Sequence, residues 1–170
     1  MKNETLNHKL QAIELLILDV DGVLTDGRIW FDANGEEYKT FHTQDGLGIK
    51  RLQKAGIAVA VITGRKSRCV RQRLQALNIQ HLFEGIDNKL PIFEQLLSTL
   101  NLSADQAAYI GDDLPDLPIM QRVGMSIAVA NAVPEVAQTA DWQTTRCGGM
   151  GAVREACDLI YHSLTVTHES

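Results

Sequence analysis

Acidic residues stand in two groups, and each group follows a short apolar run of the sequence. Asp19 and Asp21 lie at the end of the run 13–20 (IELLILDV). Asp112 and Asp113 directly follow a second run, AAYIG. Carboxylates that share a pocket at the ends of strands suit a hard, oxygen-preferring cation such as Mg²⁺. Acidic turns and helix caps are also common without a bound ion, so each group alone has a purely structural alternative.

Residues that suit a phosphate stand between the two acidic groups. Thr63, Gly64 and Arg65 lead from an apolar run into a predicted helix, where a hydroxyl, the first N–H groups and the helix dipole favour an anion. Lys89 stands in the first turn of another predicted helix, where its charge opposes the dipole. Such a locally unfavourable choice often marks a functional site. An ordinary cap at Thr63 and a solvent-exposed Lys89 are the alternatives.

The order of the predicted elements brings these residues to one edge of a sheet. Strands are predicted at 13–20, 57–62, 81–83, 107–110, 126–129 and near Trp142. Helices are predicted at 45–54, with Asp45 as its cap, and at 65–77, 89–100, 116–122, 133–137 and 152–162. This alternation predicts an α/β fold with a parallel sheet flanked by helices, and active sites in such sheets lie at the carboxyl ends of the strands. The segment 28–41, with its Asn-Gly turn, predicts a projecting β-hairpin.

Length, composition and charge indicate a single globular domain over residues 1–170. Hydrophobic residues make up 45% of the chain and charged residues 22%. The net charge of −5 argues against general nucleic-acid binding. The polar start resembles no signal peptide, and no apolar run approaches the roughly 20 residues of a membrane helix. Three cysteines without zinc spacing fit a reducing compartment, so we predict a cytoplasmic protein that binds neither nucleic acid nor a membrane.

The ordered set of motifs resembles the haloacid dehalogenase superfamily of phosphatases. Its four motifs are found here as DVDGV, the threonine of ITGR, Lys89 and GDD. The resemblance implies a Rossmann-like fold and Mg²⁺-dependent phosphoryl transfer, in which Asp19 attacks the phosphorus and forms an aspartyl-phosphate. It also implies that Asp21 protonates the leaving sugar oxygen and then activates the water that releases phosphate.

The same resemblance implies how the other residues share the work. The residues that hold Mg²⁺ are Asp19, Asp112 and, through its backbone carbonyl, Asp21. Those that bind the phosphate are Thr63, Gly64 and Lys89. Two further acids are expected to lie behind the metal ligands and orient them, namely Asp113 and Asp116.

Longer segments narrow the resemblance to the 3-deoxy-D-manno-octulosonate 8-phosphate phosphatases of lipopolysaccharide synthesis. These segments are LILDVDGVLTDG, HTQDGLGIK, VITGRKS, NKL, YIGDDLPDLP and GGMGAVREACDLI. Because 23–41 can hold only a hairpin, we expect no cap domain. The resemblance implies a homo-oligomer, a tetramer in which hairpins meet, and a flexible C-terminal tail from about 147 to 170 that can fold over a site. The expected buried contacts are Ile29, Trp30, Phe31, Tyr38 and Phe41, unless these side chains pack on their own domain.

The substrate that this family implies is a phosphorylated sugar acid. Arginine suits the sugar carboxylate through its bidentate fork, and Arg65 and Arg73 are the expected contacts within a basic cluster whose other members face solvent. The remaining sugar contacts implied by the resemblance are Asp21, Asp45, Gly46, Lys50 and Lys89. Lys50 stands where the family often has arginine, so this contact departs from the family pattern.

Two alternative functions stay open at this point. Phosphatases of nonulosonate 9-phosphates share the capless fold and the same motifs, as does a domain of some cytidylyl-sugar synthetases. A catalytically silent oligomerising module is the alternative from another class of protein. The presence of Asp19, Asp21, Lys89 and Asp112 argues against a silent module.

Overall fold

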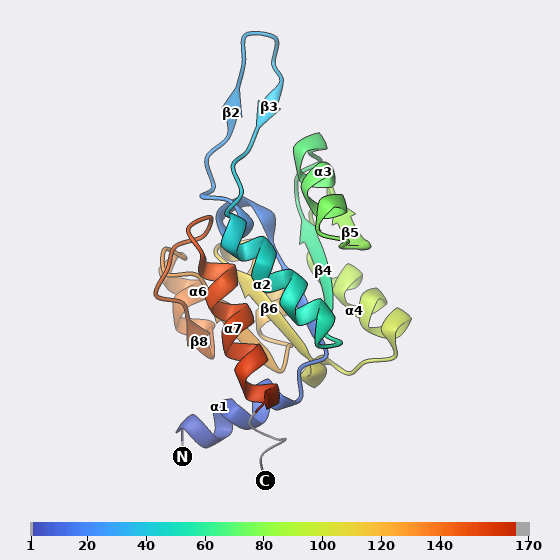
Figure 1. The fold of residues 1–170 in the computed structure, drawn as a ribbon, viewed down its shortest axis with the longest axis vertical. Coiled ribbons are helices and arrows are strands. Elements are labelled where there is room, and N and C mark those ends of the chain that lie inside the picture. Colours follow the sequence, from blue (N-terminus) through green and yellow to red (C-terminus); the bar gives the residue numbers. More distant parts are fainter. Residues whose placement is uncertain (1, 166–170) are drawn as a thin grey trace.

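A six-stranded parallel sheet forms the centre of the protein, in the strand order β5-β4-β1-β6-β7-β8 (Figure 1). The structure is a computed structural model that describes residues 2–165, with side chains from residue 5 onwards. The strands of the sheet are β1 (Leu15–Leu18), β4 (Ala58–Thr63), β5 (His81–Glu84), β6 (Ala107–Gly111), β7 (Met125–Ala128) and β8 (Trp142–Gln143). The predicted α/β fold with a parallel sheet is therefore confirmed.

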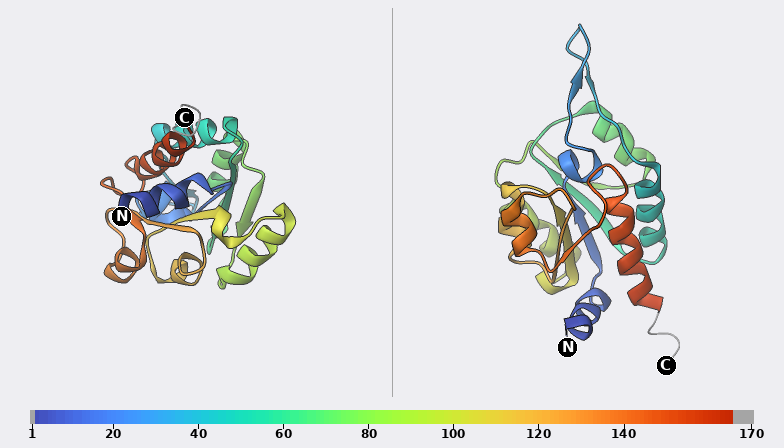
Figure 2. Two further views of the ribbon diagram at one scale, coloured as in Figure 1. Left: turned by 90° about the horizontal axis from the view of Figure 1, so that it is seen from below. Right: turned by 90° about the vertical axis from the view of Figure 1, so that its left-hand side faces the viewer.

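Helices cover both faces of this sheet (Figure 2). One face carries α1 (Lys2–Gln11), α2 (Thr43–Lys54), α3 (Arg68–Ala76) and α7 (Ala152–Thr165). The other carries α4 (Lys89–Leu100), α5 (Leu117–Met120) and α6 (Pro134–Thr139). Along β1, Leu16 and Leu18 join the first core while Leu15 and Ile17 join the second. A strand that is buried on both faces has to be apolar throughout, which explains the unbroken run in the sequence.

The helices differ from the predictions at several places, and α3 begins at Arg68, not at the predicted Arg65, so Thr63 and Gly64 lie before the helix and not at its first turn. Helix α1 was not predicted, because its sequence is polar; Leu10 anchors it in the core, and Lys9 pairs with Asp141 at 2.5 Å. The prediction that Asp45 caps α2 was wrong, since the Nδ1 atom of His42 accepts the cap hydrogen bond from the Gln44 N–H. The predicted helix 116–122 is a 3₁₀ turn at Leu114–Asp116 followed by α5. Within residues 2–165, no helix has the length and apolarity needed to span a membrane.

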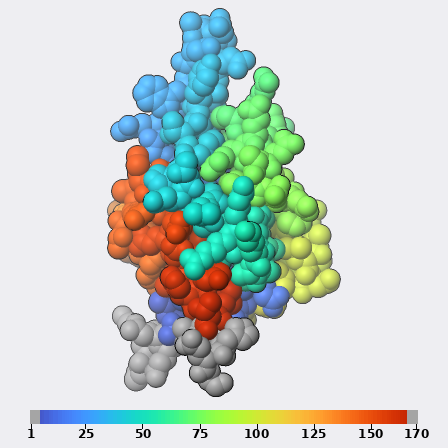
Figure 3. Space-filling view, in the orientation of Figure 1, coloured from blue at the N-terminus to red at the C-terminus, as the bar shows by residue number. Residues whose placement is uncertain are grey.

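A tight turn and a hairpin connect β1 to α2. The hairpin strands are β2 (Trp30–Phe31) and β3 (Glu37–Tyr38), which pair antiparallel as predicted. Asp32 stabilises the tip, because its side chain accepts hydrogen bonds from the N–H groups of Asn34 and Glu36 at 2.8 and 2.9 Å. The hairpin extends away from the sheet, with its tip projecting beyond the rest of the surface (Figure 3) and Glu37 in contact with Arg65 and Ser67.

Candidate functional site

A polar cavity of about 280 Å³ opens at the carboxyl edge of the sheet. Its lining comes from the segments that follow β1, β4, β5 and β6, and consists of Asp19, Asp21, Thr63, Gly64, Ile86, Asp87, Lys89, Asp112, Asp113, Pro115 and Asp116. Because β4, β1 and β6 are neighbours in the sheet, three distant parts of the sequence end at one place. All four motifs therefore meet in this cavity.

Lys89 lies almost completely buried between two carboxylates at the floor of the cavity. Its Nζ atom is 3.1 Å from Oδ1 of Asp19 and 2.8 Å from Oδ1 of Asp116. The Tyr109 hydroxyl accepts a hydrogen bond from Lys89 at 3.2 Å and donates one to Asp116 at 2.6 Å. Burial alone would lower the pKa of Lys89, but the charges of Asp19 and Asp116 outweigh it and raise the pKa. Lys89 is thus a cation held in place by three partners.

Asp116 also organises the loop that follows β6. Its Oδ2 atom accepts hydrogen bonds from the N–H groups of Asp112 and Asp113 at 3.0 and 3.3 Å. Asp113 is exposed and caps the next turn by accepting from the Leu114 N–H at 2.7 Å. Asp116 therefore contacts the backbone that carries Asp112, whereas Asp113 lies at the rim of the cavity. An orienting role for the two stays a prediction.

The carboxylates of this cavity fit a divalent cation. Carboxylate oxygens of Asp19, Asp112 and Asp116 lie within 4.8 Å of one another. Burial and the charges of Asp19, Asp116 and Asp113 raise the pKa of Asp112 to about 8. Burial and the charge of Asp116 raise the pKa of Asp19 to about 6, although Lys89 opposes the shift. Within residues 5–165, Oδ1 of Asp112 is buried without a hydrogen-bond partner, which is the kind of oxygen that a hard cation coordinates.

The turn at Val20–Leu24 fits closely beneath Asp112. Gly22 in this turn has a φ of +89°, and a Cβ atom there would lie 2.0 Å from Oδ2 of Asp112. The buried hydroxyl of Thr25 donates to the carbonyl of Val20 at 3.4 Å and accepts from the Gly27 N–H at 3.2 Å. Glycine is therefore required at position 22, both for its backbone conformation and for the space that Asp112 occupies.

Asp21 faces the base of the hairpin. Its Oδ1 atom accepts a hydrogen bond from Lys39, and its Oδ2 atom lies 3.9 Å from Nε of Arg65. Glu37 lies behind both cations and accepts hydrogen bonds from Arg65 at 2.9 Å and from the Ser67 hydroxyl at 2.6 Å. Burial would raise the pKa of Glu37, but these two bonds and the charges of Lys39 and Arg65 lower it. Neither Lys39 nor Glu37 was predicted from the sequence, because charged residues in a hairpin give no local signal.

The structure separates the predicted sugar contacts into two groups. Arg65 is half-exposed beside Asp21. Asp45, Gly46, Lys50 and Arg73 are not part of the cavity lining. Asp45 is buried and accepts a hydrogen bond from the Arg154 N–H at 2.8 Å, while Lys50 is exposed on α2. Contacts between these four residues and a sugar stay predictions.

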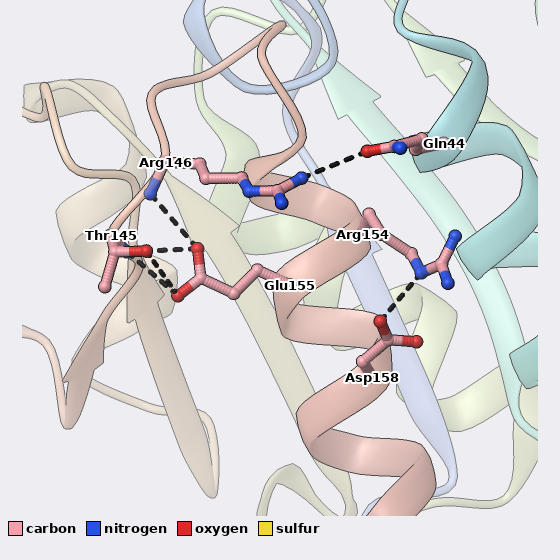
Figure 4. Close-up of a pocket in the computed structure, with 6 residues that line it drawn as sticks. All are labelled: Gln44, Thr145, Arg146, Arg154, Glu155 and Asp158. Atoms are coloured by element: carbon pink, nitrogen blue, oxygen red, sulfur yellow. Dashed lines mark hydrogen bonds and ion pairs between the residues drawn. The ribbon is translucent and has the colours of Figure 1, made fainter.

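A second cavity, of about 380 Å³, lies between the start of α2 and the start of α7 (Figure 4). The residues that line it are Gln44, Thr145, Arg146, Arg154, Glu155 and Asp158. Arg146 donates to the Gln44 side chain at 3.0 Å, and Glu155 accepts from the N–H and the hydroxyl of Thr145 at 3.0 and 3.1 Å. These contacts hold the segment that precedes α7, and none of the motif residues lies here.

The glycine-rich segment before α7 packs against the turn at Val20–Leu24. Gly149 donates a hydrogen bond to the carbonyl of Val23 at 3.0 Å, and Gly148 donates to the Asn131 side chain at 3.0 Å. A Cβ atom on Gly148 would lie 1.7 Å from the Gly22 carbonyl oxygen. The predicted flexibility of the tail stays a prediction for the part up to residue 165, and residues 166–170 lie outside the described residues.

Comparisons with known proteins agree with this geometry. Residues 82–153 match a family of haloacid dehalogenase-like hydrolases. An Escherichia coli K12 protein named 3-deoxy-D-manno-octulosonate 8-phosphate phosphatase is 51% identical over 152 residues, which cover 89% of this chain and 81% of that protein. A crystal structure of the phosphatase of that name from Yersinia pestis has a TM-score of 0.94 at 44% identity and covers 98% and 90% of the two chains. The Moraxella catarrhalis phosphatase, in complex with magnesium, phosphate and the sugar KDO, has a TM-score of 0.93 at 41% identity and covers 98% and 97%.

Proposed function

The chain belongs to the family of 3-deoxy-D-manno-octulosonate 8-phosphate phosphatases, which are haloacid dehalogenase-like hydrolases, and from this we propose that it hydrolyses that sugar phosphate to the free sugar acid and phosphate. The observation that carries the proposal is the meeting of Asp19, Asp21, Thr63, Lys89 and Asp112 in one cavity. The free sugar acid is the form that lipopolysaccharide biosynthesis would use. The reaction class is phosphoric monoester hydrolysis.

In the proposed mechanism, a carboxylate oxygen of Asp19 forms a bond to phosphorus while the bond from phosphorus to the sugar oxygen breaks. Asp21 gives its proton to that oxygen, and then takes a proton from the water that attacks the aspartyl-phosphate and frees Asp19. Lys89 and Thr63 hold phosphoryl oxygens as their charge changes. Asp19, Asp112 and the Asp21 carbonyl would hold Mg²⁺, which would supply positive charge that offsets the repulsion of an anionic nucleophile and an anionic phosphate.

The substrate test is phosphate release across a panel of sugar phosphates in the presence of Mg²⁺. The panel includes 3-deoxy-D-manno-octulosonate 8-phosphate, a nonulosonate 9-phosphate and hexose phosphates that carry no carboxylate. We expect kcat/KM to be at least about tenfold higher for the octulosonate than for the hexose phosphates, because Arg65, which lies beside Asp21, suits the carboxylate that the hexose phosphates lack. A preference for the nonulosonate would show that the proposed substrate is wrong. If no member of the panel is hydrolysed in the presence of Mg²⁺, the proposed phosphatase activity is overturned.

The hydroxyl of Tyr109 is hydrogen-bonded to both Lys89 and Asp116, and removing it tests whether their arrangement matters for activity. We expect Tyr109→Phe to lower kcat by about 5- to 20-fold and the free energy of unfolding by about 1–3 kcal/mol, because two buried hydrogen bonds, one from Lys89 and one to Asp116, are lost. Phosphate release and chemical denaturation measure the two effects. Tyr161→Phe is the matched control, since this tyrosine lies on α7, far along the sequence from the cavity lining and packed on Arg51. Unchanged kcat in Tyr109→Phe would contradict the supporting role.

The exposed apolar side chains of the hairpin support a proposed homotetramer. Ile29, Trp30, Phe31 and Tyr38 are between 37% and 60% exposed, an apolar patch that is unusual for a monomer. Phe41, which was predicted to join them, packs instead against the core of its own subunit. A second copy of this chain is therefore the proposed partner of the hairpin face.

Charge on this face is expected to break the assembly. A Trp30→Glu and Phe31→Glu double variant should fall to a smaller species by light scattering, because burying two unpaired carboxylates costs more than the contact provides. Asn34→Glu at the hairpin tip adds charge without removing an apolar side chain, and should leave the mass unchanged. A wild-type monomer at micromolar concentration would contradict the proposed tetramer.

The proposed compartment is the cytoplasm. Cys69, Cys147 and Cys157 are all free thiols. Disulfides form and persist in oxidising compartments and are rare in the cytosol. A chain that keeps three unpaired cysteines suits a reducing compartment.

A further inference from the structure

We propose that Lys39 is a positioning residue for Asp21, so that the hairpin of each subunit completes the acid–base part of its own site. Glu37 acts with it, by fixing the hairpin to the loop that follows β4. The inference rests on the proposed function, in which Asp21 moves the proton. It assigns a role in the reaction to two residues outside the four motifs.

The side chains of residues 37–39, which are β3 and the residue after it, separate two roles of the hairpin. Glu37 and Lys39 both contact the catalytic edge, whereas Tyr38 between them is exposed. The Lys39 side chain is 0% exposed and that of Glu37 is 16% exposed, whereas Tyr38 is 56% exposed. Glu37 and Lys39 therefore meet the catalytic edge, whereas Tyr38 and its cross-strand partner Trp30 stay exposed on the other side.

The charge of Lys39 is matched to its surroundings. A buried ammonium group is strongly unfavourable unless it is paired and hydrogen-bonded. Among the described residues, the acidic side chains within 4.0 Å of its Nζ atom are Asp21, which it contacts directly, and Glu37 at 3.8 Å. The burial of Lys39 is therefore compensated by the catalytic carboxylate, so the position of each group depends on the other.

The two carboxylate oxygens of Asp21 have different partners. Oδ1 is bound by Lys39, while Oδ2 has only the looser approach of Arg65 at 3.9 Å. A general acid has to lie within hydrogen-bond distance of the atom that it protonates. With Oδ1 held, Oδ2 is the oxygen left to approach the sugar oxygen, and we assign to it the proton transfer that accompanies cleavage of the bond from phosphorus to the sugar and formation of the bond to Asp19.

Glu37 ties this arrangement to the phosphate-binding segment. It accepts hydrogen bonds from Arg65 and from Ser67, at 2.9 and 2.6 Å. Both donors belong to the loop that follows Thr63, the last residue of β4. The base of the hairpin and the phosphate-binding segment are therefore fixed to each other. Lys39 lies two residues after Glu37, so the same contacts fix its position.

The test compares Lys39→Met with Lys39→Arg and with Lys54→Met as the matched control. Lys54 is exposed at the end of α2, so its loss should leave kinetics unchanged. For the sugar phosphate that wild type prefers, we expect Lys39→Met to lower kcat by about 10- to 100-fold while KM stays within about threefold. Lys39→Arg keeps the charge and should recover part of the loss.

The leaving group distinguishes positioning of the acid from a structural role. Nitrophenolate departs without a proton, whereas a sugar alkoxide needs one. In single-turnover phosphoryl transfer, Lys39→Met should therefore lose far more rate with the sugar phosphate than with p-nitrophenyl phosphate. Glu37→Gln should show the same pattern with a smaller loss, about 3- to 10-fold. Equal losses with both substrates, or a raised KM with kcat unchanged, would overturn the proposal.

Failure of the proposed function would give a different result. If wild type prefers another sugar phosphate, the substrate is wrong, and the leaving-group comparison is made with that compound. If wild type cleaves neither sugar phosphates nor p-nitrophenyl phosphate, both proposals are overturned. Circular dichroism establishes that each variant is folded. Should Lys39→Met not fold, the comparison is made with Lys39→Arg, which keeps the charge, and with Glu37→Gln, which keeps the side-chain size.

Discussion

Replacement of Asp19 by asparagine is expected to reduce kcat by at least about 10⁴-fold, the scale of loss seen when a covalent nucleophile is removed. The amide keeps the size of the side chain and can still accept a hydrogen bond from Lys89, which lies 3.1 Å away. It lacks the anionic oxygen that attacks phosphorus. Magnesium-dependent phosphate release measures the loss, and hydroxylamine-sensitive labelling of the protein should disappear together with it.

The fold should survive this change. Burial raises the pKa of Asp19 to about 6, so its charged form is held at a cost, and asparagine removes that cost along with one partner of Lys89. We expect the free energy of unfolding to change by no more than about 1 kcal/mol. Asp113→Asn, at the exposed rim of the same cavity, is the control and should keep kcat within about tenfold. Turnover in Asp19→Asn close to that of wild type would remove the nucleophile from the mechanism.

The parts of the fold that could be predicted are those in which local pattern and burial agree. The run 13–20 is apolar at every β1 position because both faces of that strand are covered, and the carboxylates that follow it could be located from this alone. Helix α1 could not be predicted, because few of its side chains enter the core and the rest are polar. The cap of α2 was misassigned for a related reason. Aspartate is a more common capping residue than histidine, but the Asp45 carboxylate accepts its hydrogen bond from the Arg154 N–H of α7.

The candidate site shows the same division. The motif residues Asp19, Thr63, Lys89 and Asp112 stand at strand or helix ends, so the topology brings them together. Lys39 reaches Asp21 from a segment that the sequence describes only as a hairpin, and the contact depends on the angle at which that hairpin leaves the sheet. Tertiary placement of this kind has no period or spacing that a sequence could display.

Asp112→Asn is expected to weaken Mg²⁺ binding by about 100-fold, because a charged ligand of the metal is lost. We expect kcat/KM to fall by about 10²- to 10³-fold as a result. The same change should stabilise the metal-free protein. Burial and the charges of Asp19, Asp116 and Asp113 raise the pKa of Asp112 to about 8, so its anion is unfavourable in the folded state. A neutral amide avoids that repulsion.

The sign of the pH dependence follows from these values. In the metal-free protein, folded Asp112 keeps its proton up to a pH of about 8, whereas the unfolded chain releases it near 3.8. The folded state therefore binds more protons over this range, and the free energy of unfolding falls as pH rises through it. Asp19 acts in the same direction between 3.8 and about 6. In EDTA we expect the wild-type Tm to fall by roughly 5 °C between pH 5 and 8.

Asp112→Asn should flatten this slope, and Mg²⁺ should reverse it for wild type, since the cation binds the deprotonated carboxylates of the folded state alone. Asp141→Asn is the control. Hydrogen bonds from Lys9 and Ser126 outweigh burial and lower the pKa of Asp141, so its contribution is constant above pH 5, and its loss should lower Tm without changing the slope. A wild-type Tm that rises with pH in EDTA, or a less stable metal-free Asp112→Asn, would contradict the argument. The acids of this cavity repel one another until a cation arrives, and that repulsion is the reason why the site favours one.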